Sequence, residues 1–161
     1  MTRSRTTAAA TVLVADRRRV TREALADALR VAGYEVCSTC ADAASAVSDA
    51  ARLRPDVCLV DVDLPGGGLT TVRAIVTAHG ATRVVVLASA VRHQELFAAL
   101  RAGADGYVLK DIDPERLPTE IDAVLDGRAA LSRELTAGLI AEFRALSVTP
   151  ARANDPRRSK Q

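Results

Sequence analysis

The sequence predicts a doubly wound α/β domain with a five-stranded parallel sheet and an extra helix near its C-terminal end. Five short apolar runs alternate with segments whose apolar residues recur every three or four positions. Strands that alternate with helices in this way pair in parallel through right-handed crossovers. The length of 161 residues and the apolar fraction of 48% suit one globular domain with a core of ordinary size.

The first half of the chain alternates strand, helix, strand and helix. Its opening run is short and largely apolar, as in a strand that is buried on both faces. The helix after this strand ends at Gly33, and the next helix ends before Pro55. Glycine and proline both commonly end helices. The expected elements are strands 11–15 and 34–38 and helices 20–32 and 41–53.

The second half repeats this alternation. A turn over residues 64–68 separates a strand from a helix, and Gly103 closes the following helix. Pro118 is expected near the first turn of the next helix, because proline is tolerated there. The expected elements are strands 57–60, 84–87 and 107–109, helices 70–79 and 95–102, and a helix that reaches Leu125.

Four residues at the ends of expected strands define a candidate site: Asp16, Asp61, Ala88 and Lys110. Ligands of open α/β sheets bind beyond the carboxyl ends of the strands, so we expect these residues to lie close together. Two neighbouring carboxylates repel one another unless a cation or a proton intervenes. Mg²⁺ prefers oxygen ligands and would suit phosphoryl transfer to a carboxylate, and Lys110 would neutralise the acceptor or its phosphoryl oxygens.

Over residues 11–127 the sequence resembles the response regulator receiver family of two-component systems, in its NarL/LuxR-type subfamily. The resemblance implies the flavodoxin-like receiver fold and a signalling protein that is not an enzyme. Five stretches carry it jointly: Val-Leu-Val-Ala-Asp at 12–16, Arg-Glu-Ala-Leu at 22–25, Arg-Pro-Asp-Val-Cys-Leu-Val-Asp at 54–61, Asp-Leu-Pro-Gly at 63–66 and Ala-Gly-Ala-Asp-Gly-Tyr-Val-Leu-Lys at 102–110.

The resemblance also implies a role for each candidate residue. Asp61 would receive a phosphoryl group from a histidine kinase. Asp16 and Asp61, with the backbone carbonyl of Asp63, would bind Mg²⁺. Lys110 would pair with the phosphoaspartate, and Tyr107 is the aromatic residue that the family uses to report the switch.

Two positions depart from the family pattern. Arg17 stands where the family has its second, metal-ligating acid, so the chain loses a metal ligand and gains a cation. We therefore expect Mg²⁺ affinity to fall sharply. Ala88 stands where the family has Thr or Ser, and a methyl group cannot hydrogen-bond a phosphoryl oxygen. Ser89 would substitute for it only if the loop were shifted by one residue.

Arg17 has two interpretations. In the first, its guanidinium forms an ion pair with Asp61 or Asp16 and stands in for the charge of the metal. In the second, Arg17, Arg18 and Arg19 form a solvated arginine face at the start of a helix.

Beyond the sheet domain, a further amphipathic helix is expected, with Ser132 as its N-cap. It resembles the linker that precedes a LuxR-type helix-turn-helix, and the residues after it are too few for that output domain. An exposed apolar stripe usually marks an interface, so we expect a homodimer, with packing onto its own domain as the alternative. The stripe consists of Leu135, Leu139, Phe143 and Leu146.

The expected domain organisation follows from these segments and from the charge distribution. The net charge is +2, but basic ends flank a mildly acidic middle, which is not the pattern of a nucleic-acid-binding module. No apolar run suits a membrane span or a signal peptide, so we expect a cytoplasmic protein. The divisions are a disordered basic N-terminus at 1–9, a receiver domain at 10–127, a linker or dimerisation helix at 128–146 and a disordered basic tail at 147–161.

Smaller motifs have structural interpretations. Cys37 and Cys40 form a C-x-x-C without the second pair that a zinc site needs, so these two and Cys58 are interpreted as small apolar side chains. The glycines at 66–68 fit neither a P-loop nor a dinucleotide fingerprint and are assigned to a turn.

Two functional hypotheses stay open. One is an atypical receiver with impaired Mg²⁺-dependent phosphorylation at Asp61, which acts through a histidine kinase, another signalling protein or its own dimer. The other is a phospho-accepting receiver of a LuxR-type transcriptional regulator without its DNA-binding domain. A remote alternative is a haloacid dehalogenase-type phosphatase, which also begins with Asp-x-Asp after a strand, but no later Asp-Asp pair follows here.

Overall fold

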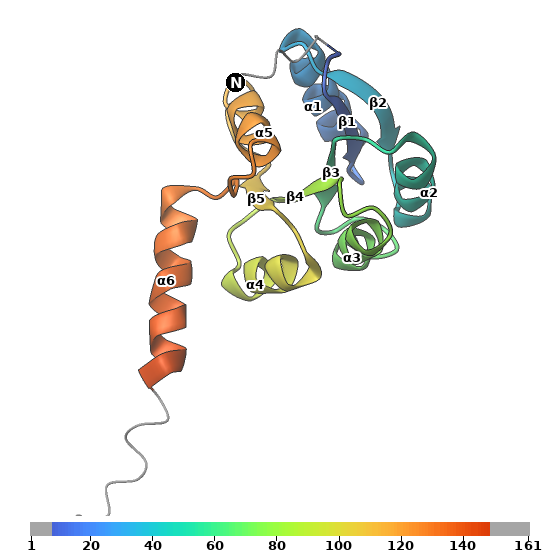
Figure 1. Cartoon of the computed structure of the whole chain (residues 1–161). Coiled ribbons are helices and arrows are strands. Elements are labelled where there is room, and N and C mark those ends of the chain that lie inside the picture. Colours follow the sequence, from blue (N-terminus) through green and yellow to red (C-terminus); the bar gives the residue numbers. More distant parts are fainter. Residues whose placement is uncertain (1–7, 149–161) are drawn as a thin grey trace, which may run out of the picture. The chain divides into compact units, whose positions relative to one another are not determined.

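The computed structural model describes residues 8–148 and contains one five-stranded parallel sheet in the order β2-β1-β3-β4-β5 (Figure 1). This confirms the predicted doubly wound fold. The chain winds from β1 to one edge of the sheet and then back past β1 to the other edge, which leaves β1 and β3 adjacent at the centre. The strands are β1 (Thr11–Ala15), β2 (Glu35–Cys40), β3 (Val57–Asp61), β4 (Arg83–Ala88) and β5 (Gly106–Leu109).

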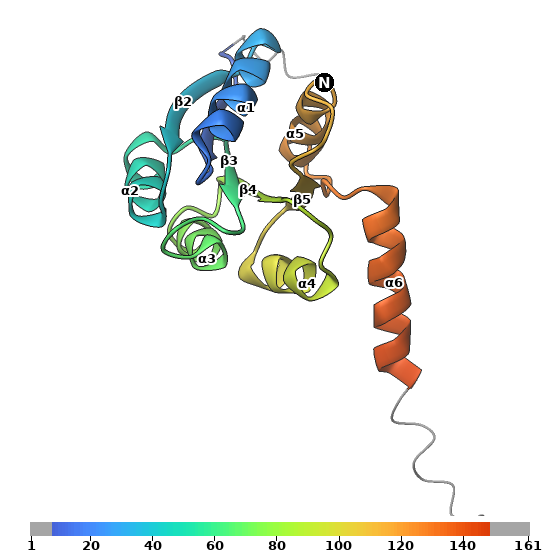
Figure 2. The same ribbon diagram turned by 180° about the vertical axis from the view of Figure 1, so that it is seen from behind.

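Helices cover both faces of the sheet. Helices α1 and α5 lie on one face, and α2, α3 and α4 lie on the other (Figures 1 and 2). A second compact unit begins at Ser132 and contains α6. The helices are α1 (Arg19–Val31), α2 (Ala43–Leu53), α3 (Gly68–Ala78), α4 (His93–Ala102), α5 (Leu117–Leu125) and α6 (Arg133–Val148).

The central strand β3 explains why the site lies where it does. All of its residues are buried, because neighbouring strands cover its edges and helices cover its faces. Along it, Val57 and Leu59 belong to the apolar cluster formed with α1 and α5. Five consecutive buried residues make β3 a rigid support, and Asp61 is its last residue. The sheet therefore holds the carboxylate of Asp61 at a fixed position, where the carboxyl ends of its strands lie.

The start of α3 differs from its prediction. It begins at Gly68, not at residue 70. A Cβ atom at Gly68 would lie 2.4 Å from the carbonyl oxygen of Asp61 and 2.3 Å from that of Val62, so only glycine allows the helix to start this close to β3. The glycines after Pro65 therefore serve this close approach, which agrees with their assignment to a turn.

The second strand also differs from its prediction. It spans Glu35–Cys40 in place of 34–38, and its pairing with β1 contains a one-residue irregularity that leaves Cys37 out of register. Tyr34 precedes the strand, and its hydroxyl bonds to Asp122 and to the carbonyl of Pro118 on α5. Tyr34 thus connects the loop before β2 to α5 through hydrogen bonds. The alternation of apolar and polar residues in the sequence does not reveal this role.

The predicted helix-end signals on the C-terminal side agree with the structure. Pro118 occupies the first turn of α5, where no intrahelical amide is needed. The hydroxyl of Ser132 accepts a hydrogen bond from the amide of Leu135 at 3.2 Å, as expected of an N-cap. Between these helices, Ala130 pairs with β5: the amide of Tyr107 donates to its carbonyl at 2.9 Å. Within residues 8–148, no helix is both long and apolar enough to cross a membrane.

Candidate functional site

The carboxyl ends of β1, β3 and β5 bring three predicted site residues into one pocket. Asp16 directly follows β1, Asp61 ends β3 and Lys110 directly follows β5. Both carboxylates are fully buried, and the side chain of Lys110 is 11% exposed. Residues that are 45 and 94 positions from Asp16 thus meet because parallel strands end at the same edge of the sheet.

The ammonium of Lys110 lies between the two carboxylates. Its Nζ is 2.8 Å from Oδ2 of Asp16 and 2.9 Å from Oδ1 of Asp61. Within the described residues, Oδ2 of Asp16 is a buried oxygen that no donor meets with hydrogen-bond geometry, so its compensation is the charge of Lys110. Without that cation, two buried negative charges would face one another at close range.

Backbone amides hold the carboxylates in place. Oδ1 of Asp61 accepts from the amide of Asp63 at 3.0 Å, and Oδ2 accepts from the amide of Arg17 at 3.2 Å. The amide of Arg18 donates to Oδ1 of Asp16 at 2.8 Å. These bonds fix both side chains from the loops that follow their strands, so the pocket is preorganised.

Arg17 lies beside Asp61, as the first interpretation of it requires, but the contact is loose. Its Nε is 3.9 Å from Oδ2 of Asp61, and its side chain is 40% exposed. An exposed pair at this distance contributes less than about 1 kcal/mol to stability. The formal charges of Arg17 and Lys110 together nevertheless equal those of the two buried carboxylates and are opposite in sign.

The donor set does not fit a tightly held Mg²⁺. Within the described part of the chain, no group of three or more His, Cys, Asp or Glu side chains could hold a metal ion. The ammonium of Lys110 lies within 3 Å of both carboxylates, and a guanidinium stands where a third acid would be needed. Mg²⁺ is usually held by one or two carboxylates and several waters, but here the ammonium of Lys110 already occupies the space between both carboxylates and competes for their oxygens.

The fourth strand contributes no polar group to the pocket. Ala88 is its last residue and is fully buried, whereas Ser89 is exposed. Asp63 is exposed as well, and its backbone amide donates a hydrogen bond to Asp61. The structure therefore gathers Asp16, Asp61, Lys110 and Arg17, with Ala88 at the end of the neighbouring strand β4.

Tyr107 is fully buried on β5 and is held by two hydrogen bonds. Its hydroxyl donates to the carbonyl of Ala90 at 3.2 Å and to Oε1 of Glu95 at 2.9 Å. Burial, and then the bond to Glu95, raises the pKa of Tyr107 well above its usual range. The sequence analysis did not single out Glu95, and its place in the first turn of α4 is the only local signal that it would face β5.

A second residue that the sequence analysis passed over is Arg22. Its guanidinium donates to the backbone carbonyl of Asp16 at 2.9 Å, which ties α1 to the end of β1. It belongs to the Arg-Glu-Ala-Leu stretch that carries the resemblance, so the stretch itself was the available signal. The cysteines are free, and burial raises the pKa of each thiol, which agrees with their interpretation as inert side chains.

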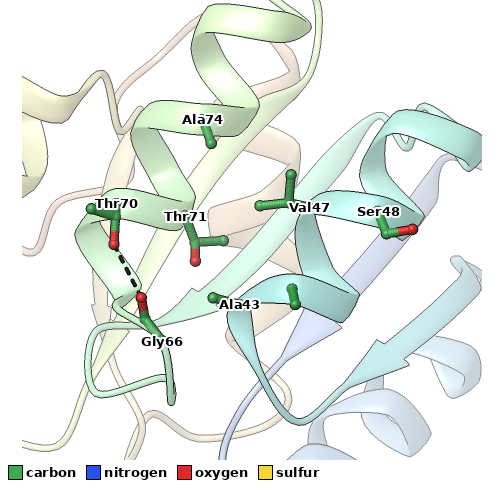
Figure 3. Close-up of a pocket in the computed structure, with 8 residues that line it drawn as sticks. Ala43, Val47, Ser48, Gly66, Thr70, Thr71 and Ala74 are labelled. Carbon is green, nitrogen blue, oxygen red and sulfur yellow. Dashed lines mark hydrogen bonds between the residues drawn. The ribbon is translucent and has the colours of Figure 1, made fainter.

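A hollow between α2 and α3 lies apart from this chemistry. Figure 3 shows it lined by small residues, among them Ala43, Gly66 and Ala74, with Thr70 bonded to the carbonyl of Gly66. No charged side chain lines it, so it offers no group that could move a proton or bind a phosphoryl group.

In the second unit, α6 exposes much of the predicted stripe. Phe143 is 68% and Leu146 72% exposed, and Ile140, which the prediction omitted, is also exposed. Leu135 is different: it is only 2% exposed, so it is not available to a partner. The predicted stripe is therefore corrected at its N-terminal end, where Leu135 is buried although its neighbours Glu134 and Thr136 are exposed.

The geometry of the pocket agrees with the family comparison. Residues 12–122 match the response regulator receiver domain family. The chain belongs to that family. Its receiver domain is thus a module of two-component signalling.

Similar proteins place the receiver in the NarL/LuxR-type group. The oxygen regulatory protein NreC of Staphylococcus aureus (strain JH9) is 34% identical over 111 residues, which are 68% of this chain and 51% of NreC. The chain thus spans about half the length of the curated relatives it matches.

Two solved structures show the same fold. A LuxR-family two-component response regulator from Aurantimonas sp. SI85-9A1 matches with a TM-score of 0.73 and 32% identity, over 86% of this chain and 99% of that one. The signal receiver domain of NarL from Mycobacterium tuberculosis matches with a TM-score of 0.72 and 27% identity, over 76% of this chain and all of that domain.

Proposed function

We propose that this chain is an atypical receiver, in which Lys110 and Arg17 occupy the electrostatic role of Mg²⁺ and phosphorylation of Asp61 is impaired. It signals through protein–protein contacts, with a histidine kinase or another signalling protein and with a second copy of itself. The proposal rests above all on Arg17, whose Nε lies 3.9 Å from Oδ2 of Asp61 at the position where the family has a metal-ligating acid.

Phosphoryl transfer to Asp61 needs three things from the protein. One carboxylate oxygen must be free to attack phosphorus, a cation must neutralise the charge that develops, and donors must meet the phosphoryl oxygens. Here Lys110 supplies the cation. Oδ2 of Asp61 accepts one hydrogen bond from a backbone amide, and a carboxylate oxygen has two lone pairs, so one remains available for attack. Ala88 offers no donor to a phosphoryl oxygen. The third requirement is therefore the one that is poorly met.

The decisive test is phosphorylation of the full chain by acetyl phosphate with Mg²⁺, followed by intact-mass spectrometry. We expect slow and incomplete addition of one phosphoryl group to the native chain. Arg17→Asp restores a metal ligand and removes a cation, so labelling accelerates by at least about tenfold. Adding Ala88→Thr, which supplies a hydroxyl donor, increases it further.

Three controls make the result specific. Asp61→Asn must abolish labelling, which identifies the acceptor. Arg30→Asp makes the same charge change as Arg17→Asp on an exposed part of α1 and must leave labelling unchanged. Rapid, complete labelling of the native chain at Asp61 would contradict the proposal.

That contrary result would favour a second function, a phospho-accepting receiver. One observation supports it: the acceptor, its lysine partner and the buried Tyr107 all stand in one domain with their family positions intact. Lys110 would then move from Asp16 towards the phosphoryl oxygens of modified Asp61, and Asp16 would be left for the cation.

The proposed homodimer uses the exposed stripe of α6. Its exposed members are Ile140, Phe143 and Leu146, of which Phe143 and Leu146 are the most exposed, whereas Leu139 is half-buried. Apolar side chains this exposed on one helix are covered in a stable assembly more often than they face water. Since the two copies of a symmetric dimer present the same patch, one helix stripe suffices to form the contact.

A further inference from the structure

Helices α3 and α4 lie on the face of the sheet opposite α1 and α5 (Figures 1 and 2). Side chains of these two helices line a groove with a volume of about 290 Å³. Three of its lining residues are apolar and two are arginines from different helices, so it combines an apolar floor with a cationic rim. The lining residues are Leu69, Thr70, Arg73, Ala98, Arg101 and Ala102.

The two arginines of the groove have no acidic partner. Within the described residues, no carboxylate forms an ion pair with Arg73 or Arg101. Helix α3 contains no acid at all, and the one acid of α4, Glu95, accepts the hydroxyl of Tyr107.

Arginines on other helices behave differently. Each of three examples pairs with an acid three or four residues away on its own helix, as surface arginines commonly do. These pairs are Arg19–Glu23, Arg30–Asp27 and Arg52–Asp49. Arg73 and Arg101 differ from these three because their own helices hold no acid three or four residues away and because both line one hollow.

The groove is preformed, because α3 and α4 meet at a contact that only glycine allows. Gly103 caps α4 with a φ of 103°, and a Cβ atom there would lie 2.8 Å from Cγ1 of Val76 on α3. Close packing thus sets the separation of the two helix backbones at Arg73 and Arg101, and their guanidiniums reach the hollow from opposite sides of a preformed groove.

We propose that this groove binds an acidic segment of a partner protein, in which two carboxylate side chains flank an apolar one. The carboxylates pair with Arg73 and Arg101, and the apolar side chain packs on Leu69 and Ala98. A nucleic acid fits less well, because residues 8–148 carry 16 lysines and arginines against 19 acids and so repel a polyanion.

This inference gives the chemistry of one protein partner, and so it rests on the proposed function, which is signalling through protein–protein contacts. The groove itself does not involve Asp61. Rapid labelling of Asp61 would contradict the proposed function and leave peptide binding unaffected, so the two proposals fail in different experiments.

The test is a titration of the ¹⁵N-labelled full chain with acetyl-Glu-Leu-Glu-amide, followed by amide and arginine side-chain resonances. We expect saturable shifts confined to Leu69–Arg73 and Ala98–Ala102. Arg73→Gln and Arg101→Gln each weaken binding by about fivefold, the effect of losing one exposed ion pair, and the double variant weakens it by about 25-fold. Arg30→Gln, which removes an arginine outside the groove, leaves affinity unchanged, and unaltered spectra elsewhere show that each variant is folded.

Three further probes separate the possible ligands. Acetyl-Lys-Leu-Lys-amide must produce no shifts at these residues. Inorganic phosphate must bind more weakly than the acidic peptide, because it leaves the apolar floor uncovered. Equal binding of phosphate, preferential binding of a single-stranded oligonucleotide, or shifts from the acidic peptide that persist in the double variant would each overturn the proposal.

Discussion

At the scale of single residues, Lys110 decides the character of the site. Its ammonium is nearly buried and contacts two fully buried carboxylates that have no other cation within 3 Å. Breaking a buried ion pair by removing one partner leaves uncompensated charge, which costs far more than losing a surface pair. Lys110 therefore serves the stability of the fold as well as any phosphoryl chemistry at Asp61.

Replacing Lys110 with methionine tests this role. We expect the free energy of unfolding to fall by about 3 kcal/mol, because the two buried carboxyl groups would face one another without the ammonium between them. Mg²⁺ should restore part of the loss by entering the vacated position, so it should raise the Tm of Lys110→Met and leave that of the native chain almost unchanged. Thermal unfolding with and without Mg²⁺ measures both effects, and equal Mg²⁺ responses would contradict this account.

A second residue-scale prediction concerns the two tyrosines. Burial and hydrogen bonds to Asp122 and Glu95 raise the pKa of Tyr34 and of Tyr107, respectively. An unfolded tyrosine ionises at about pH 10, whereas these two keep their protons in the folded chain at that pH. The unfolded state alone then releases protons as the pH rises above about 10, so folding stability falls there.

Alkaline titration followed by phenolate absorbance checks this, since the chain has two tyrosines and no tryptophan. We expect little phenolate at pH 11 in the folded chain and a steep rise that coincides with unfolding. Tyr34→Phe and Tyr107→Phe isolate one phenol each. A phenol that titrates near pH 10 in the folded state would show that its hydrogen bonds are not formed in solution.

At the scale of elements, glycines set how closely helices approach their neighbours. Gly68 lets α3 begin against the carbonyl oxygens at the end of β3, and Gly103 lets the end of α4 pack on Val76. Gly33 and Gly103 have similar left-handed backbones, with φ of 92° and 103°. They differ in surroundings: a Cβ at Gly33 would meet nothing within 4 Å, whereas one at Gly103 would meet Val76.

This pair separates backbone strain from packing. Gly33→Ala should destabilise the fold by about 1 kcal/mol through backbone strain alone. Gly103→Ala carries the same strain and an added clash with α3, and we expect a total of about 2 to 3 kcal/mol. Urea unfolding of the two variants measures the difference. Equal losses would mean that α3 shifts without cost, and the α3–α4 groove would then not be rigid.

At the scale of the whole molecule, self-association is the property that the exposed side chains of α6 predict. Phe143→Glu places a charge at an exposed apolar position, which should disrupt a helix-mediated dimer while leaving the receiver fold intact. Light scattering at tens of micromolar should give twice the monomer mass for the native chain and the monomer mass for the variant. Glu142→Gln, on the same helix, should remain dimeric, and a monomeric native chain would contradict the prediction.

Hydrophobic periodicity predicted the alternation of strands and helices, and with it the strand ends at which Asp16, Asp61 and Lys110 lie. General rules of chain crossover predicted a doubly wound parallel sheet. The departures at Arg17 and Ala88 were visible only against the pattern of the family that the sequence resembles.

The tertiary structure decided how those residues interact. Packing between distant segments sets the directions of side chains. It places Lys110 between Asp16 and Asp61, limits how closely Arg17 approaches Asp61, and brings Glu95 to the hydroxyl of Tyr107. The same holds for Leu135: its spacing predicted an exposed position, but the structure buries it. It also holds for Arg73 and Arg101, which are 28 positions apart and line one groove only because α3 and α4 pack together. Local pattern specifies which face of an element is apolar, but only the packed fold determines which charges meet and which stay unpaired.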